Sequence, residues 1–120
     1  MNAATPILVA SILLWPSAAA LAANPLYLSC EFKNPTGDPQ VFNFALDEAA
    51  GTFGVYVPSS GSQRTSQGVF AANIASLNEG TVAWEIDLSK GLIVRDMRMV
   101  GAKDKGVCKE ISAEQSGFEP

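Results

Sequence analysis

Residues 26–33, LYLSCEFK, alternate apolar and polar side chains, with leucine, leucine, cysteine and phenylalanine at every second position. This period of two is typical of a β-strand that buries one face, and it places Cys30 on the buried side. The turn-forming stretch NPTGDP, residues 34–39, ends the strand because it holds two prolines and a glycine. The same alternation recurs along the chain, so this stretch sets the fold class.

Six further segments complete a set of seven candidate strands, joined by short turns. They are residues 42–46, 53–57, 69–77, 81–88, 92–100 and 107–111. The pattern predicts an all-β domain, a small antiparallel meander that closes into a barrel or a sandwich, because closure removes exposed strand edges. We expect its core to contain Cys30, Phe32, Phe42, Phe44, Leu46, Phe53, Val55, Trp84, Ile86 and Leu88.

Three segments are harder to interpret. Residues 69–77, VFAANIASL, fit one face of a helix as well as a strand, and the hairpin-like turn at 78–80 favours the strand. Residues 92–100, LIVRDMRMV, show no clean alternation, which predicts a β-bulge near Arg95 and Asp96. Residues 58–68, PSSGSQRTSQG, lack apolar side chains and predict the longest irregular connection.

The first 22 residues contain no charged side chain. An apolar run at 6–15 is followed by small residues, and Ala20-x-Ala22 predicts signal-peptide cleavage after Ala22. An uncleaved membrane anchor is the alternative, because 3–23 is long enough to span a bilayer. Cleavage would leave a β domain over 23–111 and a flexible tail over 112–120, periplasmic or secreted and with no stable membrane insertion.

The chain has two cysteines, Cys30 in the first strand and Cys108 in the last. An exported protein folds in an oxidising compartment, where an even pair of cysteines forms a disulfide. We therefore expect a bond that joins the first and last strands of the domain.

The composition argues against several function classes. The absence of histidine excludes Ser-His-Asp and Cys-His nucleophile systems and any metal site that uses imidazole. The net charge of −4 argues against nucleic-acid binding. The sequence contains no G-x-S-x-G, S-x-x-K or glycine-rich phosphate loop. We expect no catalytic residue, no cofactor and no metal, and a carboxylate pair such as Glu85 and Asp87 is interpreted as a solvated strand face.

Two stretches are candidate partner-binding sites. Arginine and methionine are enriched at protein interfaces, and long polar loops on a rigid barrel often carry binding residues. The candidates are Ser60, Gly61, Ser62 and Arg64 in the loop, and Arg95, Met97, Arg98 and Met99 in the strand. The sequence thus favours a non-catalytic exported binding domain whose partner is another envelope or extracellular protein. A structural component of the envelope is the alternative.

The outline with cysteines in Leu28-Ser29-Cys30 and Gly106-Val107-Cys108 resembles the periplasmic lysozyme inhibitors of the membrane-bound C-type family, and equally other small exported bacterial domains. The resemblance implies a β-barrel and inhibition of a lysozyme-type hydrolase through a Ser-Gly loop. Ser60-Gly61 matches that loop, but no tyrosine follows it. The family's later Trp-x-Lys-Gly stretch is not reproduced, because Trp84 stands six positions before Lys90.

Overall fold

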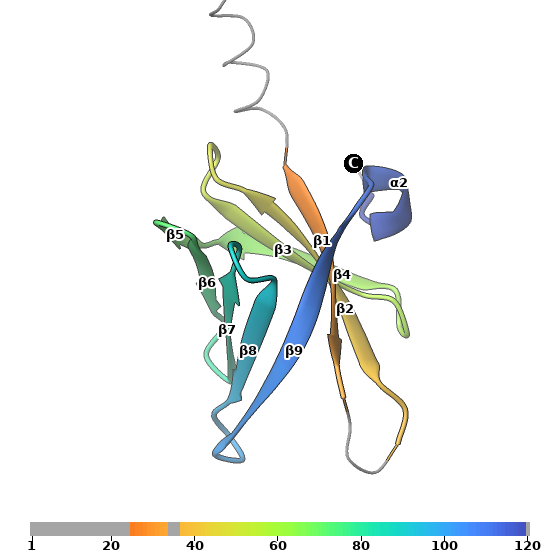
Figure 1. Cartoon of the computed structure of the whole chain (residues 1–120), viewed down its shortest axis with the longest axis vertical. Helices are drawn as coiled ribbons and strands as arrows, with labels where there is room; N and C mark the ends of the chain where they lie inside the picture. The colour runs from red at the N-terminus through yellow and green to blue at the C-terminus, as the bar shows by residue number, and fades with distance from the viewer. Residues whose placement is uncertain (1–24, 34–36, 120) are drawn as a thin grey trace, which may run out of the picture.

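The computed structural model describes residues 25–33 and 37–119, which form an all-β domain (Figure 1). This part of the chain contains nine strands where the sequence indicated seven, and the all-β prediction is confirmed. The elements are β1 Leu26–Phe32, β2 Gln40–Asp47, β3 Thr52–Val57, β4 Ser62–Gln67, β5 Val69–Ala71, β6 Ile74–Asn78, β7 Val82–Asp87, β8 Leu92–Met97, β9 Ala102–Ile111 and α2 Ala113–Ser116. The signal-peptide and anchor alternatives for residues 1–22 lie outside the described residues.

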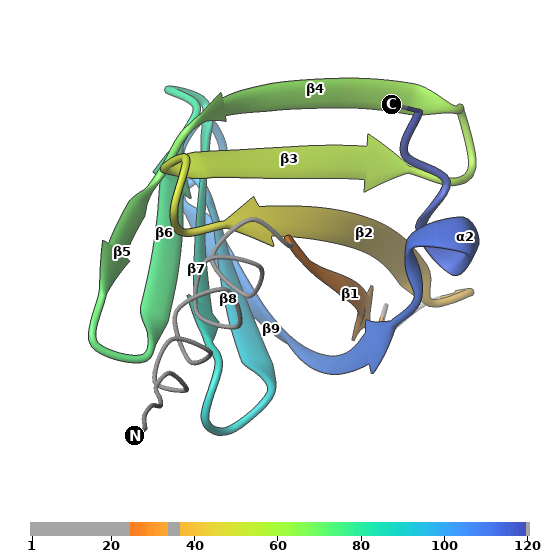
Figure 2. The ribbon, with the colours of Figure 1, turned by 90° about the horizontal axis from the view of Figure 1, so that it is seen from above.

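The strands form one sheet in the order β4-β3-β2-β1-β9-β8-β7-β6-β5, and each neighbouring pair is antiparallel. The first and last strands are therefore neighbours at its centre. The sheet coils until its two ends approach each other, as Figure 2 shows from above. Of the two predicted architectures, the structure is the nearly closed barrel.

A single run of chain, residues 62–71, closes most of the gap between the two ends. Its first half, β4, pairs with β3, and its second half, β5, pairs with β6. The run changes partner at Gly68, whose N–H donates to the carbonyl oxygen of Gly51 at 2.9 Å. A Cβ at Gly68 would lie 2.8 Å from Cβ of Phe53 and 3.1 Å from the carbonyl oxygen of Ser76. Glycine is thus required where the strand crosses.

Cys30 and Cys108 are direct cross-strand partners on β1 and β9, and they form the predicted disulfide. The Cys30 side chain is fully buried. The bond therefore fixes the centre of the sheet from inside the barrel.

The interior is filled by inward-facing residues from every strand except β4, and β5 contributes the partly buried Phe70. Trp84 lies at its middle, with ring centroids 5.2 Å from Phe42 and 5.3 Å from Phe44 in edge-to-face contacts. Eight of the ten expected core residues are buried, and Phe42 and Leu88 pack against them partly exposed. The core also contains Leu28, Ala75, Leu77 and Ile93, which the predicted set omitted.

Two segments between β3 and β7 differ from the predictions. Residues 58–68 are mostly strand, because backbone pairing with β3 holds Ser62–Gln67 without any apolar side chain. Residues 69–77 form strand, as the favoured interpretation of the sequence had it, but they are divided into two strands, β5 and β6, rather than one. A turn separates them, with Ala72 at a φ of +55°.

Strands β8 and β9 also correct the sequence interpretation. The register between β7, β8 and β9 is continuous, so the predicted bulge near Arg95 and Asp96 is wrong. The alternation of apolar and polar side chains was not visible in the sequence because a charged residue, Arg95, occupies an inward position between Ile93 and Met97. The last strand begins at Ala102 rather than 107, and most of the predicted charged turn belongs to it.

Residues 112–119 pack on the outside of the barrel, so the flexible-tail prediction is wrong for them. Ser112 caps the helical turn α2, and the Asn43 side-chain amide donates to the Ser116 carbonyl oxygen at 2.9 Å. The Phe118 ring contacts Tyr27 and Tyr56 at centroid distances of 6.1 and 5.8 Å. The tail is ordered because it covers this outer face.

Candidate binding surface

The outer face of the sheet from β6 to β9 carries the candidate site. Strand alternation sends Trp84 and Ile86 inward and Ala83 and Glu85 outward on β7. The register then places Glu85 beside Val94 of β8, and Ala83 beside Asp96. The outward residues of these four neighbouring strands therefore form one continuous surface.

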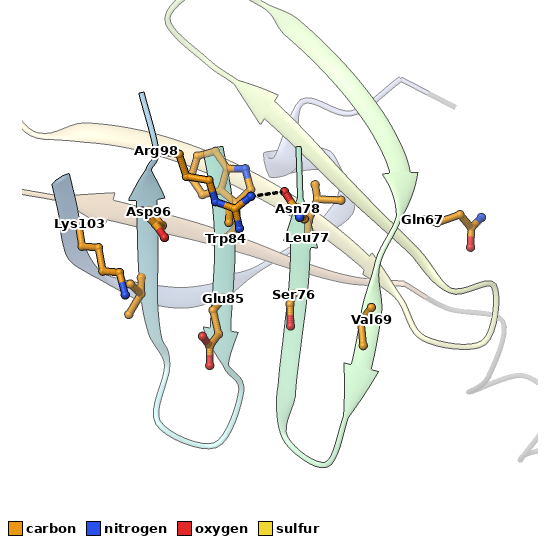
Figure 3. Close-up of a pocket in the computed structure, with 12 residues that line it drawn as sticks. Gln67, Val69, Ser76, Leu77, Asn78, Trp84, Glu85, Asp96, Arg98 and Lys103 are labelled. Atoms are coloured by element: carbon orange, nitrogen blue, oxygen red, sulfur yellow. Dashed lines mark hydrogen bonds between the residues drawn. The ribbon is translucent and has the colours of Figure 1, made fainter. Parts of the chain in front are cut away.

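This surface is hollowed into a groove of about 490 Å³ (Figure 3). Its apolar lining includes Val69, Ala83 and Val94, together with the edges of the buried Leu77 and Trp84. Val69 is 65% exposed on the short strand β5, although valine is among the residue types most often buried in proteins. The groove thus offers an apolar floor that the chain itself leaves uncovered.

Charged side chains of both signs surround that floor. Glu85 and Asp96 supply carboxylates, and Arg98 and Lys103 supply cations. Arg98 donates from Nη1 to Oδ1 of Asn78 at 2.9 Å, as Figure 3 shows. Among the described residues the two salt bridges are Arg64–Glu79 and Arg95–Asp104, so the charges of the groove are available to a partner.

Arg95 lies inside the barrel rather than in the predicted surface patch. It is 8% exposed and donates from Nε to Oδ1 of Asp104 at 3.1 Å and from Nη2 to Oε1 of Gln40 at 2.9 Å. Its guanidinium carbon lies 4.5 Å from the ring centroid of Phe32 and 5.3 Å from that of Phe42. This arginine closes one end of the aromatic core by ion pairing and cation–π contact.

The rest of the predicted strand patch divides between two faces. Met97 points inward and is partly buried, whereas Arg98 and Met99 are exposed. Met99 is 80% exposed. Arg98 is therefore the one predicted residue that lines the groove, and Met99 lies beyond it in the β8–β9 turn.

The predicted loop site is also divided. Ser60 and Gly61 lie exposed in the β3–β4 turn, whereas Ser62 and Arg64 belong to β4. Arg64 forms a two-pronged ion pair with Glu79, with an Nη2 to Oε1 distance of 2.9 Å. The structure does not bring these residues together with the groove as one site.

Glu79 joins the two sides of the barrel gap. Its Oε1 also accepts from Nε1 of Trp84 at 2.7 Å. The hydrogen bond from Arg64 holds the pKa of Glu79 below its usual value, against the opposing effect of burial, and it raises the pKa of Arg64. The Arg64–Glu79–Trp84 network thus ties β4 to the β6–β7 turn and to the core.

The carboxylates of β7 have separate roles. Asp87 accepts from the Ser89 hydroxyl at 2.7 Å and from the backbone N–H groups of Ser89 and Lys90, so it shapes the β7–β8 turn. The Ser89 hydroxyl holds the pKa of Asp87 below its usual value. Glu85 instead faces the groove. From the sequence, both carboxylates were interpreted as part of a solvated strand face. The alternation of residues 81–88 did predict that Glu85 points outward, but it gave no sign of the groove.

The comparisons with known proteins add no relative: no family model, curated protein or solved structure matches the chain. Within 25–33 and 37–119, no group of three or more cysteine, aspartate or glutamate side chains is placed to hold a metal ion. None of the helices in that part of the chain has the length and apolar character needed to cross a membrane. The site is therefore argued from its own geometry.

Proposed function

We propose that the chain is a non-catalytic binding domain of the cell envelope or the extracellular medium, whose partner is another protein. The observation that carries this proposal is the groove on β5–β9, where an exposed apolar floor is bordered by unpaired charges of both signs. A polypeptide segment of the partner matches this chemistry, because it presents apolar side chains together with amide and charged groups.

The scaffold supports a binding role. The groove lies on strands whose inward faces hold the aromatic core, and the disulfide ties the sheet at its centre. A surface fixed in this way loses little conformational entropy on binding.

Export is supported by two features. Residues 1–22 have the apolar run and the small-residue ending of a signal peptide. A disulfide persists in oxidising compartments and is rare in reducing ones. Amino-terminal sequencing of the protein from an envelope fraction tests this part, and a cytoplasmic protein that still begins at Met1 would contradict it.

Site-specific photo-crosslinking in cells tests the groove. A benzophenone amino acid replaces Lys103, at the edge of the groove, and in a matched control it replaces Lys109, which lies on the same strand outside it. We expect a discrete adduct from position 103 and none from position 109. The charge-reversing pair Glu85→Lys and Asp96→Lys should abolish that adduct.

Two outcomes would contradict the proposal. Equal labelling at both positions would mean that the groove holds no particular partner. Turnover of a substrate in a broad hydrolase screen, with no adduct at position 103, would favour an enzyme.

Inhibition of a lysozyme-type hydrolase is the second candidate. The observation in its favour is that Ser60-Gly61 lies exposed in the turn between β3 and β4, at one margin of the barrel (Figure 2). A bacterial lysis assay with C-type lysozyme tests it, with Ser60→Ala as the variant. Undiminished lysis at high molar excess of this protein would remove the candidate.

A further inference from the structure

Strand β4 lies at the border of the sheet, and one of its two edges pairs with no described strand. β3 pairs with it along its whole length on one side. On the other side, the same run of chain pairs with β6 only from Val69 onward, where it has become β5. Figure 2 shows β4 as the outermost strand along one side of the barrel. The backbone edge of residues 62–67 is therefore open.

The alternation of the ladder decides which backbone groups this open edge presents. The Gly68 N–H donates to the Gly51 carbonyl oxygen at 2.9 Å, so residue 68 turns its backbone groups toward β3. In an antiparallel ladder every second residue does the same, and the residues between them turn the other way. Gln63, Thr65 and Gln67 therefore direct their N–H and C=O groups toward the open edge.

The end of β6 holds a further unpaired position across the gap. The Leu88 N–H donates to the Asn73 carbonyl oxygen at 2.8 Å, so residue 73 and every second residue after it face β7. Asn78 consequently turns its backbone groups toward the side of β5, but the pairing with β5 ends at Ser76. The two borders of the sheet thus diverge while both still carry unused backbone groups, on Gln67 and on Asn78.

The ion pair between Arg64 and Glu79 crosses the gap on the inner side. Arg64 is the cross-strand partner of the fully buried Val55, so both side chains leave the sheet on the same face. On the outer side, Gln63 contacts Glu119 through its side-chain amide alone. All six residues of β4 are exposed. The neighbouring contacts therefore support the border without occupying its backbone edge.

The open edge of β4 lacks the usual protection against pairing. Natural sheets protect their edges with lysine, proline, a bulge or an inward-pointing charge, because an unpaired strand recruits another strand. β4 contains no lysine and no proline, and its register with β3 has no bulge. Its one charge, on Arg64, points inward but is neutralised by Glu79. The edge can therefore accept an added strand.

We propose that the partner segment docks on this edge as an added β-strand and continues into the groove. The inference rests on the proposed function, because it assigns the conformation of the segment that the groove binds. Three edge residues, Gln63, Thr65 and Gln67, span about five strand positions of such a segment. Gln67 and Asn78 also line the groove, so a segment that leaves the edge at this end enters it. Backbone bonds to β4 supply affinity, and side chains in the groove supply selectivity.

A second copy of this chain fits the edge less well than a free segment does. β4 has no apolar side chain, so two paired β4 edges would lack the apolar centre and the roughly 1,000 Å² of a stable interface. The β4 strand of a second copy is also held by its own β3, whereas a free segment can follow the edge into the groove. The occupant is therefore a segment that is extended and unpaired before it binds.

Amide hydrogen exchange of the isolated protein, followed by NMR, tests whether the edge is open. We expect the amides of Gln63, Thr65 and Gln67 to exchange at least about tenfold faster than those of Arg64 and Ser66, which β3 protects. Equal exchange in the two sets would overturn the proposal, because β4 would then be paired on both sides or on neither. A dimer in sedimentation velocity that Thr65→Pro dissociates would assign the edge to a second copy instead.

Proline at position 65 tests the occupant. The Thr65 N–H points to the open edge, so Thr65→Pro removes an edge donor and leaves the bonds to β3 in place. With the benzophenone amino acid at position 103 in cells, we expect the yield of the partner adduct to fall at least about tenfold. Circular dichroism and a thermal melt verify the fold. If Thr65→Pro does not fold, Gln63→Pro removes a different edge donor and replaces it.

Glu48→Pro is the matched control. Glu48 is exposed at the first position of the β2–β3 turn, which is the position that Pro58 occupies in the β3–β4 turn. The two turns also share a glycine with positive φ, Gly51 at +73° and Gly61 at +76°. We expect the adduct yield from position 103 to stay within about twofold of that without the substitution.

The outcomes separate this proposal from the proposed function. An adduct at position 103 that Thr65→Pro leaves unchanged would overturn strand addition, while the groove would still bind its partner. An equal fall in Thr65→Pro and Glu48→Pro would also overturn it, because the loss would not depend on the edge. The absence of any adduct without these substitutions would contradict the proposed function and this inference with it.

Discussion

Loss of the disulfide is expected to remove at least about a third of the stability of the domain. We consider the pair Cys30→Ala and Cys108→Ala, because alanine leaves no polar group at the fully buried position 30. The two cysteines are 78 positions apart in the sequence. A cross-link over a loop of that length lowers the entropy of the unfolded chain by an amount worth about 4.5 kcal/mol at 25 °C. Small domains have only about 5–15 kcal/mol of total stability.

The structure indicates that the cost arises in the unfolded state. The cysteines are cross-strand partners in a ladder that runs along the whole of β1, so the strands remain paired when the bond is absent. The folded barrel should therefore persist in the variant, and its unfolded chain should expand. An expanded unfolded chain exposes more surface, which raises the urea m-value.

Urea unfolding followed by circular dichroism measures both effects. We expect the variant to lose about 3–4.5 kcal/mol of unfolding free energy, with an increased m-value. Wild type reduced with dithiothreitol serves as the control and should agree with the variant within about 1 kcal/mol. A loss below about 1 kcal/mol with an unchanged m-value would refute the reasoning, because it would mean that the bond does not constrain the unfolded chain.

Three further predictions test the interior and the barrel gap. Arg95→Met should lower the unfolding free energy by about 2–4 kcal/mol in urea titrations, because it leaves Asp104 without its ion-pair partner, whereas the exposed Arg98→Met should change it by less than about 0.5 kcal/mol. Glu79→Gln should cost about 1–2 kcal/mol at pH 7. The pKa of the Glu79 carboxyl is lower in the folded than in the unfolded protein. The difference in unfolding free energy between wild type and variant should therefore be constant above the unfolded pKa and disappear as the pH falls through the folded pKa. A difference that grows at low pH would contradict this prediction. Gly106→Ala should cost at least about 2 kcal/mol in thermal melts, since its Cβ would lie 2.6 Å from the Glu31 carbonyl oxygen.

The sequence predicted those strands in which the inward face is apolar throughout. In β1 and β7 each inward position is apolar, so the alternation is visible and the core residues follow from it. The disulfide was predictable for a related reason, because two cysteines on inward positions of the first and last strands have no other partner.

The predictions failed where an inward position is polar or where pairing alone holds the strand. Arg95 occupies an inward position because its guanidinium forms an ion pair with Asp104 and lies over two aromatic rings. These partners lie on other strands. β4 has no apolar side chain, and its backbone bonds to β3 define it. Local patterns carry no information on either arrangement, since both depend on the register of the closed sheet.

The groove could be predicted only in part for the same reason. Arg98 was selected for its residue type, and it does line the groove. Val69 and Lys103 come from strands whose bounds the sequence misassigned, so their meeting with Glu85 depended on the register of five strands. Residue type can therefore identify individual residues of a binding surface, whereas their arrangement into a groove depends on the order and register of the strands.

The division of the arginines connects the fold to the proposed functions. Arg64 and Arg95 form ion pairs that stabilise the barrel. Arg64 pairs with Glu79 across the gap between the two ends of the sheet, and Arg95 pairs with Asp104 at the end of the aromatic core. With these two engaged, the cations left for a partner lie among carboxylates, because Arg98 and Lys103 line the groove together with Glu85 and Asp96. The groove thus presents charges of both signs on an acidic chain, which favours a polypeptide partner over nucleic acid.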